Sequence, residues 1–180
     1  MKSFRLNRNA AILCVAMGTV LMTSVPAYAG SASANLGVSA SVAANCTITT
    51  APVAFGAYDP IVTNASTALS GTGSVTIACT KSSVPTIGLG LGANAVGAVR
   101  NMVAGGVSLP YELYQAPTNV AGAACGALTT VWGTSGAGLL TTVAAPSKAA
   151  RTYNVCGSIP AGADVAAGAY ADTVVATVNF

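Results

Sequence analysis

The cysteines are the residues whose type and number point most directly to chemistry. Beyond residue 29 the chain has four of them: Cys46, Cys79, Cys125 and Cys156. An even number of cysteines is typical of disulfides in exported proteins, and four cysteines allow three pairings. A metal site is a poor alternative, because the chain has no CxxC spacing and no histidine. Two disulfides are therefore expected, with the pairing left open.

The other reactive side chains do not form a catalytic set. Each of the four acidic residues stands alone in the sequence, and the nearest pair is Asp164 and Asp172. Lone carboxylates beside turn residues are usually solvated or cap the local backbone. No serine lies in a GxSxG or SxxK setting. The sequence therefore predicts no enzyme, no catalytic, metal or cofactor site, and no small-molecule substrate.

Residues 1–29 are interpreted as a secretory signal peptide. Three basic residues precede an uncharged apolar run from residue 10 to residue 22, and Ala27-Tyr28-Ala29 places small residues at the cleavage positions. A retained membrane anchor is the alternative, but the apolar run is short for a span and no stop-transfer pattern follows. Beyond this segment four basic side chains balance four acidic ones, so no basic patch argues for nucleic acid.

The last eleven residues, 170–180, alternate as a β-strand does. One face carries Val174, Ala176, Val178 and Phe180, and threonine, valine and asparagine lie on the other. The sequence then stops, so no hairpin partner follows this strand. Its free edge is expected to pair with a strand from elsewhere.

A second alternating segment lies near the start of the exported chain. Leu36, Val38, Ala40 and Val42 are separated only by glycine or serine. Small residues between apolar ones suit a strand that lies in a narrow groove. This segment has no obvious partner nearby in the sequence.

Between these ends the sequence predicts short strands separated by glycine, proline, asparagine and aspartate. The candidate strands are residues 47–55, 74–79, 86–91, 96–103, 109–114, 129–132, 139–143 and 152–159. No segment has convincing helical periodicity, which favours a single all-β sandwich domain. Residues 116–138 are expected to form a long loop or a loose hairpin held by Cys125. A disordered linker is the alternative, but Trp132 argues for packing.

Several motifs recur together in one known family. They are NCTI at 45–48, FGAYDP at 55–60, VTIAC at 75–79, YELY at 111–114, WG at 132–133, SIPAG at 158–162 and the ending that begins GAYADTV at 168. In this order the chain resembles the spore coat protein U family, the subunits of archaic chaperone–usher pili. The match covers nearly all of residues 34–180. Each motif is weak alone, and the ordered set is specific.

The resemblance implies a fold and a mode of assembly. The family fold is an incomplete immunoglobulin-like β-sandwich that lacks its last strand and is completed by donor-strand complementation. On this basis residues 30–44 are expected to be a donor strand whose Leu36, Val38, Ala40 and Val42 enter a neighbour, and residues 45–180 the pilin domain. The terminal strand, with Val174, Ala176, Val178 and Phe180, is expected to border the acceptor groove and to bind the chaperone.

The resemblance also implies partners, location and disulfides. The expected partners are a periplasmic pilus chaperone, an outer-membrane usher and identical or related pilin subunits, with export to the periplasm and then to a surface pilus that supports attachment or biofilm formation. Cys46 is expected to pair with Cys79, which leaves Cys125 for Cys156, although the family pattern does not demand the last two cysteines.

Two other functions remain open from the sequence. One is a structural protein of a spore or cell coat, which would need the same export and the same completion of the sheet edge. The other is a surface-binding adhesive module that uses exposed aromatic residues, for which Tyr58, Tyr114 and Trp132 are the candidates. Aromatic side chains dominate core burial, so core or corner positions are the favoured interpretation of these three.

Overall fold

The computed structural model describes residues 28–180 of the chain. It divides into an N-terminal unit that ends at Ala40 and a domain that spans Ser41–Phe180. Residues 28–45 are exposed and form no strand. The strand expected around residues 36–42 is therefore absent from this single chain, since a strand requires a hydrogen-bonded neighbour. The expected signal peptide lies outside the described residues, apart from its last two positions.

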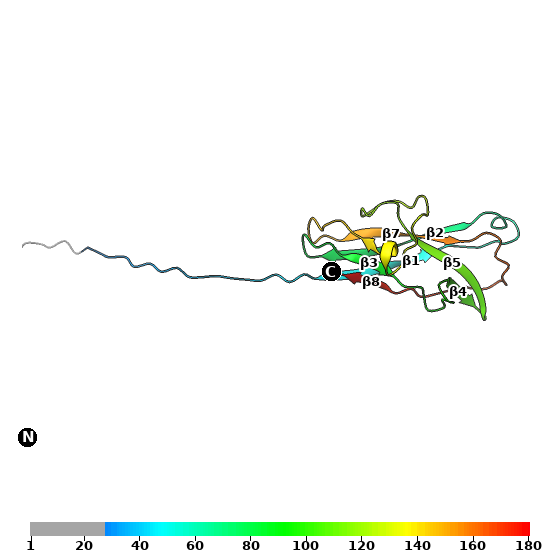
Figure 1. Ribbon diagram of the computed structural model, residues 1–180, viewed down its shortest axis with the longest axis horizontal. Helices are drawn as coiled ribbons and strands as arrows, with labels where there is room; N and C mark the ends of the chain where they lie inside the picture. Colours follow the sequence, from blue (N-terminus) through cyan, green and yellow to red (C-terminus); the bar gives the residue numbers. More distant parts are fainter. Residues whose placement is uncertain (1–27) are drawn as a thin grey trace, which may run out of the picture. The chain divides into compact units, whose positions relative to one another are not determined.

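The domain is a sandwich of two antiparallel sheets (Figure 1). The larger sheet has the order β1-β2-β7-β5-β4 and consists of β1 (Cys46–Ala54), β2 (Leu69–Cys79), β7 (Arg151–Ile159), β5 (Val107–Gln115) and β4 (Arg100–Ala104). The smaller sheet has the order β6-β3-β8 and consists of β6 (Leu140–Thr141), β3 (Thr86–Leu89) and β8 (Ala176–Asn179). A 3-10 turn, η1, covers Gly136–Gly138. The all-β class expected from the sequence is confirmed.

The two sheets enclose a core of alternating apolar side chains. The core residues from the strands include Val75 and Ile77 of β2, Ile87 and Leu89 of β3, Tyr111 and Leu113 of β5, and Tyr153 and Val155 of β7. Burying one such side chain stabilises the fold by about 1.5–3 kcal/mol. Within residues 28–180 no helix combines the length and the apolar character needed to cross a membrane.

Two of the three aromatic residues considered as surface contacts are used inside the domain. Trp132 is completely buried, and its indole N–H donates to the Ile87 carbonyl at 2.9 Å. The Tyr58 hydroxyl donates to the Pro160 carbonyl and accepts from the Ala163 N–H, both at 2.8 Å. Tyr58 and Trp132 are therefore corner and core residues, as expected.

Both disulfides join the cysteines as the family resemblance implies. Cys46 and Cys79 are opposite one another in the β1–β2 ladder, and their bridge closes one end of it. Cys125 is bonded to Cys156 of β7, so the second bridge ties the irregular segment between β5 and η1 to the larger sheet. Residues 129–132, expected as a strand, contribute only an isolated bridge between Val131 and Tyr114.

The terminal segment is less regular than its alternation predicts. It pairs first at Ala171 with Val103 of β4, and only residues 176–179 form a ladder, with β3. Between these points the Thr173 and Val175 carbonyls accept hydrogen bonds from the loop that follows β3. The segment passes from the edge of one sheet to the edge of the other, so it cannot keep one continuous ladder.

Candidate strand-binding groove

Each sheet ends in two edge strands, and one edge strand of the larger sheet lies beside one of the smaller sheet. β1 is the last strand of the larger sheet, where it pairs with β2, and β8 is the last strand of the smaller sheet, where it pairs with β3. β1 and β8 contact each other without forming a ladder (Figure 1). The sandwich therefore has an open side where two free strand edges meet, as a missing strand would leave it.

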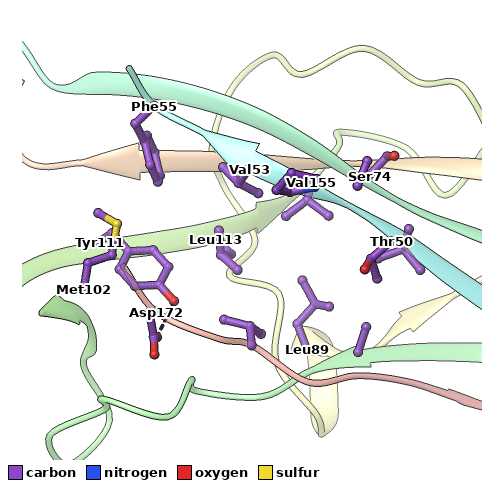
Figure 2. Close-up of a pocket in the computed structure, with 15 residues that line it drawn as sticks. Thr50, Val53, Phe55, Ser74, Leu89, Met102, Tyr111, Leu113, Val155 and Asp172 are labelled. Carbon is purple, nitrogen blue, oxygen red and sulfur yellow. Dashed lines mark hydrogen bonds between the residues drawn. The ribbon is translucent and has the colours of Figure 1, made fainter. Parts of the chain in front are cut away.

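A cavity of about 200 Å³ opens along this side. Its walls come from β1, β2, β4, β5, β7, the end of β3 and the segment leading into β8. Figure 2 shows Val53, Leu113, Val155 and Leu89 converging on its centre. The Phe55 and Tyr111 rings meet edge-on at its end, with centroids 6.3 Å apart. The lining is mainly apolar and suits side chains of the same character.

A second hollow of about 720 Å³ adjoins the first, since Val53, Phe55 and Met102 line both. It continues over Leu109 and Ile159 to the loops at residues 56–61 and 164–170, where Tyr58 and Tyr170 form part of its wall. We call the two hollows together the groove. The groove follows the open side of the sandwich toward the loops that connect β1 to β2 and β7 to β8.

Glycines make room for the side chains at the junction of the two hollows. Gly71 of β2 is paired with Gly157 of β7. A Cβ atom on Gly157 would lie 2.6 Å from Cζ of Phe55 and 2.7 Å from Cγ1 of Val53. A Cβ on Gly71 would lie 2.7 Å from Cδ1 of Phe55. Val53 and Phe55 therefore rest on a surface that only glycine provides.

One acidic residue lines the first hollow, and its carboxylate is hydrogen-bonded on several sides. Asp172 accepts a hydrogen bond from the Tyr111 hydroxyl at 2.7 Å, and two more from the backbone and side-chain N–H groups of Asn94 at 3.0 and 3.1 Å. Burial raises the pKa of Tyr111 above its ordinary value, and the hydrogen bond to Asp172 and its charge add to this effect. The expectation that Asp172 is solvated or caps its local backbone is wrong, because the fold brings Tyr111 and Asn94 to it from distant parts of the sequence.

A buried arginine holds the wall behind the groove. Arg100 of β4 is completely buried and forms an ion pair with Glu112 of β5. Its guanidinium also donates to the Gly90 carbonyl at 2.8 Å and to the Trp132 carbonyl at 2.6 Å. These bonds tie β4 and β5 of one sheet to the end of β3 in the other. Sequence patterns do not reveal this role, because a lone arginine belongs to no periodic pattern.

The residues expected to border the acceptor groove have different positions. Val174 and Ala176 line it, whereas Val178 packs against the core. Phe180 is 59% exposed and follows the last residue of β8.

The side chains expected to act as donors are open to solvent. Leu36 and Val38 are each 88% exposed, Val42 is 85% exposed, and Ala40 is also exposed. Exposure of several large apolar side chains in one short segment is unusual for a surface that stays uncovered.

Comparison with known proteins finds a matching family model and a relative of similar length. The Spore Coat Protein U domain model matches residues 32–177. Protein U of Myxococcus xanthus is 35% identical over 185 residues, which cover 94% of this chain and 97% of that protein.

A solved structure shares the fold. It is a crystal structure of the CsuC–CsuE chaperone–tip adhesion subunit pre-assembly complex from archaic chaperone-usher Csu pili of Acinetobacter baumannii. One of its chains matches with a TM-score of 0.53 at 22% identity, over 77% of this chain. The match spans only 40% of that solved chain. The family model and the relative both extend over most of the sequence, and the chain belongs to the Spore Coat Protein U domain family, whose members are structural rather than enzymatic proteins.

Proposed function

We propose that this protein is a structural subunit of a secreted surface pilus and that it polymerises by donor-strand exchange. The observation that carries the proposal is the apolar groove between the free edges of β1 and β8. Two unpaired edges side by side are a template for one further strand. The likeness of the fold to a chain from a chaperone–subunit complex of pili supports this interpretation of the open side.

The donor is the exposed N-terminal segment of another copy, residues 30–44. Its backbone would form hydrogen bonds with the free edges, and the side chains on one face would fill the groove. In β-strand addition the backbone bonds give affinity and the side chains give specificity. Leu36, Val38, Ala40 and Val42 occur at every second position, so all four would point inward together. A slip by one residue would turn the intervening glycine and serines inward, which makes the register specific.

Export and assembly follow from the same groove. A periplasmic chaperone would occupy the open side until an outer-membrane usher exchanges it for the donor strand of the next subunit. The polymer would then reach the cell surface and support attachment or biofilm formation. The solved complex that shares the fold holds a chaperone with a tip adhesion subunit before assembly, and this supports the chaperone step.

A coat protein is the second candidate function. It is favoured by the identity to Protein U over nearly the whole chain and by the name of the family. Donor-strand exchange could build a layer as well as a fibre. Electron micrographs of cells with and without the gene distinguish them, since a pilus extends from the cell whereas a coat forms a layer around it.

Substitution of Val38 by Asp tests the donor strand. The variant is expected to fold and to be captured by the chaperone but to form no polymer, because insertion would bury an unpaired carboxylate. Ser39→Asp is the matched control, since it places the same charge on the opposite face of the same strand. The measurement is the amount of surface polymer in the native host with its secretion genes intact. Normal polymer from Val38→Asp would show that the donor strand lies elsewhere.

A further inference from the structure

The exposed charged side chains of the domain are unevenly distributed. Among the described residues, Arg100 and Arg151 are buried, Glu112 is paired with Arg100, and Asp172 is bonded to Tyr111. The remaining charged side chains are two lysines and two aspartates: Lys81, Lys148, Asp59 and Asp164. The lysines lie at one end of the sandwich and the aspartates at the other.

The lysines are at the end where the N-terminal segment leaves the domain. Lys81 follows β2 by two residues, and it lines a surface hollow together with Lys148 and Asn45. The Asn45 N–H donates to the Thr80 hydroxyl at 3.0 Å, and the Thr80 N–H donates to the Asn45 carbonyl at 2.9 Å. This end, with Lys81, Val84 and Lys148, is called the basic pole.

The aspartates lie in two loops that are bonded together. Oδ1 of Asp59 accepts hydrogen bonds from the Ile61 and Val62 N–H groups at 2.9 and 3.1 Å. These bonds lower the pKa of Asp59 and favour its charged form, and the bond from Val62 has the larger effect. The second loop is bonded to the loop of Asp59. The Asn64 carbonyl accepts a hydrogen bond at 2.8 Å from the Gly162 N–H, two residues before Asp164.

This second end, with Asp59, Ile61, Val62 and Asp164, is called the acidic pole. The whole length of β2, eleven residues or roughly 30 Å, separates the two poles. In Figure 1 the C-terminus lies beside the start of β1, opposite the loops that carry the acidic pole. Ile61 is 82% exposed and Val62 is 74% exposed, and Val84 at the basic pole is 54% exposed. Each pole therefore combines charge with an uncovered β-branched residue.

We propose that the basic pole of one copy docks against the acidic pole of the next copy. The proposal rests on the proposed function, because a donor strand is what brings two copies together. A head-to-tail contact places lysines against aspartates and covers Ile61 and Val62, whereas contacts between like poles would oppose like charges. A head-to-tail contact leaves one free pole at each end of the assembly, so further copies can extend it into a fibre.

The charges also set the direction in which the donor strand enters. The strand leaves its own domain at the basic pole, so the poles meet only if its C-terminal end emerges from the groove at the acidic pole. The larger hollow of the groove opens there, with Ile61 and Asp164 in its wall. Because β8 runs toward the basic pole, the entering strand is antiparallel to it. Exposed charges of this kind act mainly on orientation and association rate.

The test is the rate at which the purified full-length chain polymerises, followed by light scattering. Lys81→Glu with Lys148→Glu is expected to slow polymerisation about tenfold at low salt, and addition of Asp164→Lys to restore part of the rate. Thr72→Glu with Thr152→Glu adds negative charge at exposed positions of β2 and β7, between the poles and away from the free edges, and is expected to leave the rate near that of the wild type. Raising the salt from about 0.02 to about 0.5 M should slow the wild type and speed up the lysine variant.

A wild-type rate that does not change with salt, or a lysine variant no slower than the control, would overturn the pole contact. Melting temperatures of both double variants show whether either has lost its fold. The Val38→Asp chain is run in parallel. If it polymerises like the wild type, the proposed donor strand has failed; if it does not polymerise and the lysine variant matches the control, only the pole contact has failed.

Discussion

At the scale of single residues, the contact between Tyr111 and Asp172 controls how the chain enters β8. Asp172 precedes β8 by four residues, and its bonds to Tyr111 of β5 and to Asn94 fix the segment across the open side of the sandwich. A Cβ atom on Gly92 would overlap the Asp172 carboxylate, so the loop that approaches it needs glycine. The wall of the groove therefore depends on one hydroxyl and one carboxylate.

This contact makes stability depend on pH in the alkaline range. The pKa of Tyr111 is higher in the folded chain than in the unfolded chain, so its contribution is complete below pH 10 or so and is lost as the pH rises above that value. The free energy of unfolding of the wild type, minus that of Tyr111→Phe, is expected to fall by up to about 1.4 kcal/mol per pH unit there. Denaturant titrations of both proteins measure it. A difference that stays constant from pH 8 to about 11.5 would contradict this assignment.

At the scale of elements, β1 keeps the groove open through its irregular end. The β1–β2 register shifts between Ala51 and Ala54, which turns Val53 and Phe55 over the paired glycines of β2 and β7. β-bulges of this kind commonly redirect side chains at sheet edges. The shape of the groove at its junction is thus set by the backbone of β2 and β7, by Val53 near the end of β1 and by Phe55 just after it.

Replacement of Gly157 by Ala tests this arrangement. The added methyl group would collide with Phe55 and Val53, and overpacking of this type costs about 1–3 kcal/mol. The variant is expected to unfold at lower denaturant concentration and to polymerise more slowly, because the displaced side chains intrude into the groove. Gly90→Ala is the control, since a Cβ there would come no closer than 3.6 Å to its neighbours. Equal losses in both variants would argue against a special role for the glycine surface.

At the scale of the whole molecule, the core of the domain is uncovered on one side, between β1 and β8. Core residues come from both sheets, and the two disulfides join β1 to β2 and the loop after β5 to β7. None of these connections covers the side between β1 and β8. Anything that fills the groove should therefore stabilise the domain by mass action.

A peptide of residues 32–44 provides the corresponding measurement. It is added to the full-length Val38→Asp chain, which is expected to accept a strand without donating one. At about one hundred times its dissociation constant the peptide should add about 2.7 kcal/mol to the free energy of unfolding, and the melting temperature should rise with its concentration. A peptide that itself carries Val38→Asp should have no effect. If both peptides stabilise equally, the groove does not recognise this face of the strand.

The sequence by itself determined the class of the domain and most of its strands. Alternation is a local property, so Val75 and Ile77 or Leu109 to Leu113 show which face is buried without reference to any partner. The number of cysteines predicted two disulfides, and the ordered motifs predicted the family and, through it, the pairing.

Only the tertiary structure decided which residues shape the groove. Asp172 and Tyr111 are 61 positions apart, and Gly71 lies opposite Gly157 because β2 pairs with β7. The poles likewise arise from folding: of the four arginines and lysines within residues 28–180, it buries two and places the other two at one end. A sequence pattern reports how a residue relates to its neighbours along the chain. These contacts depend instead on which strands become neighbours in space, and packing of the two sheets settles that.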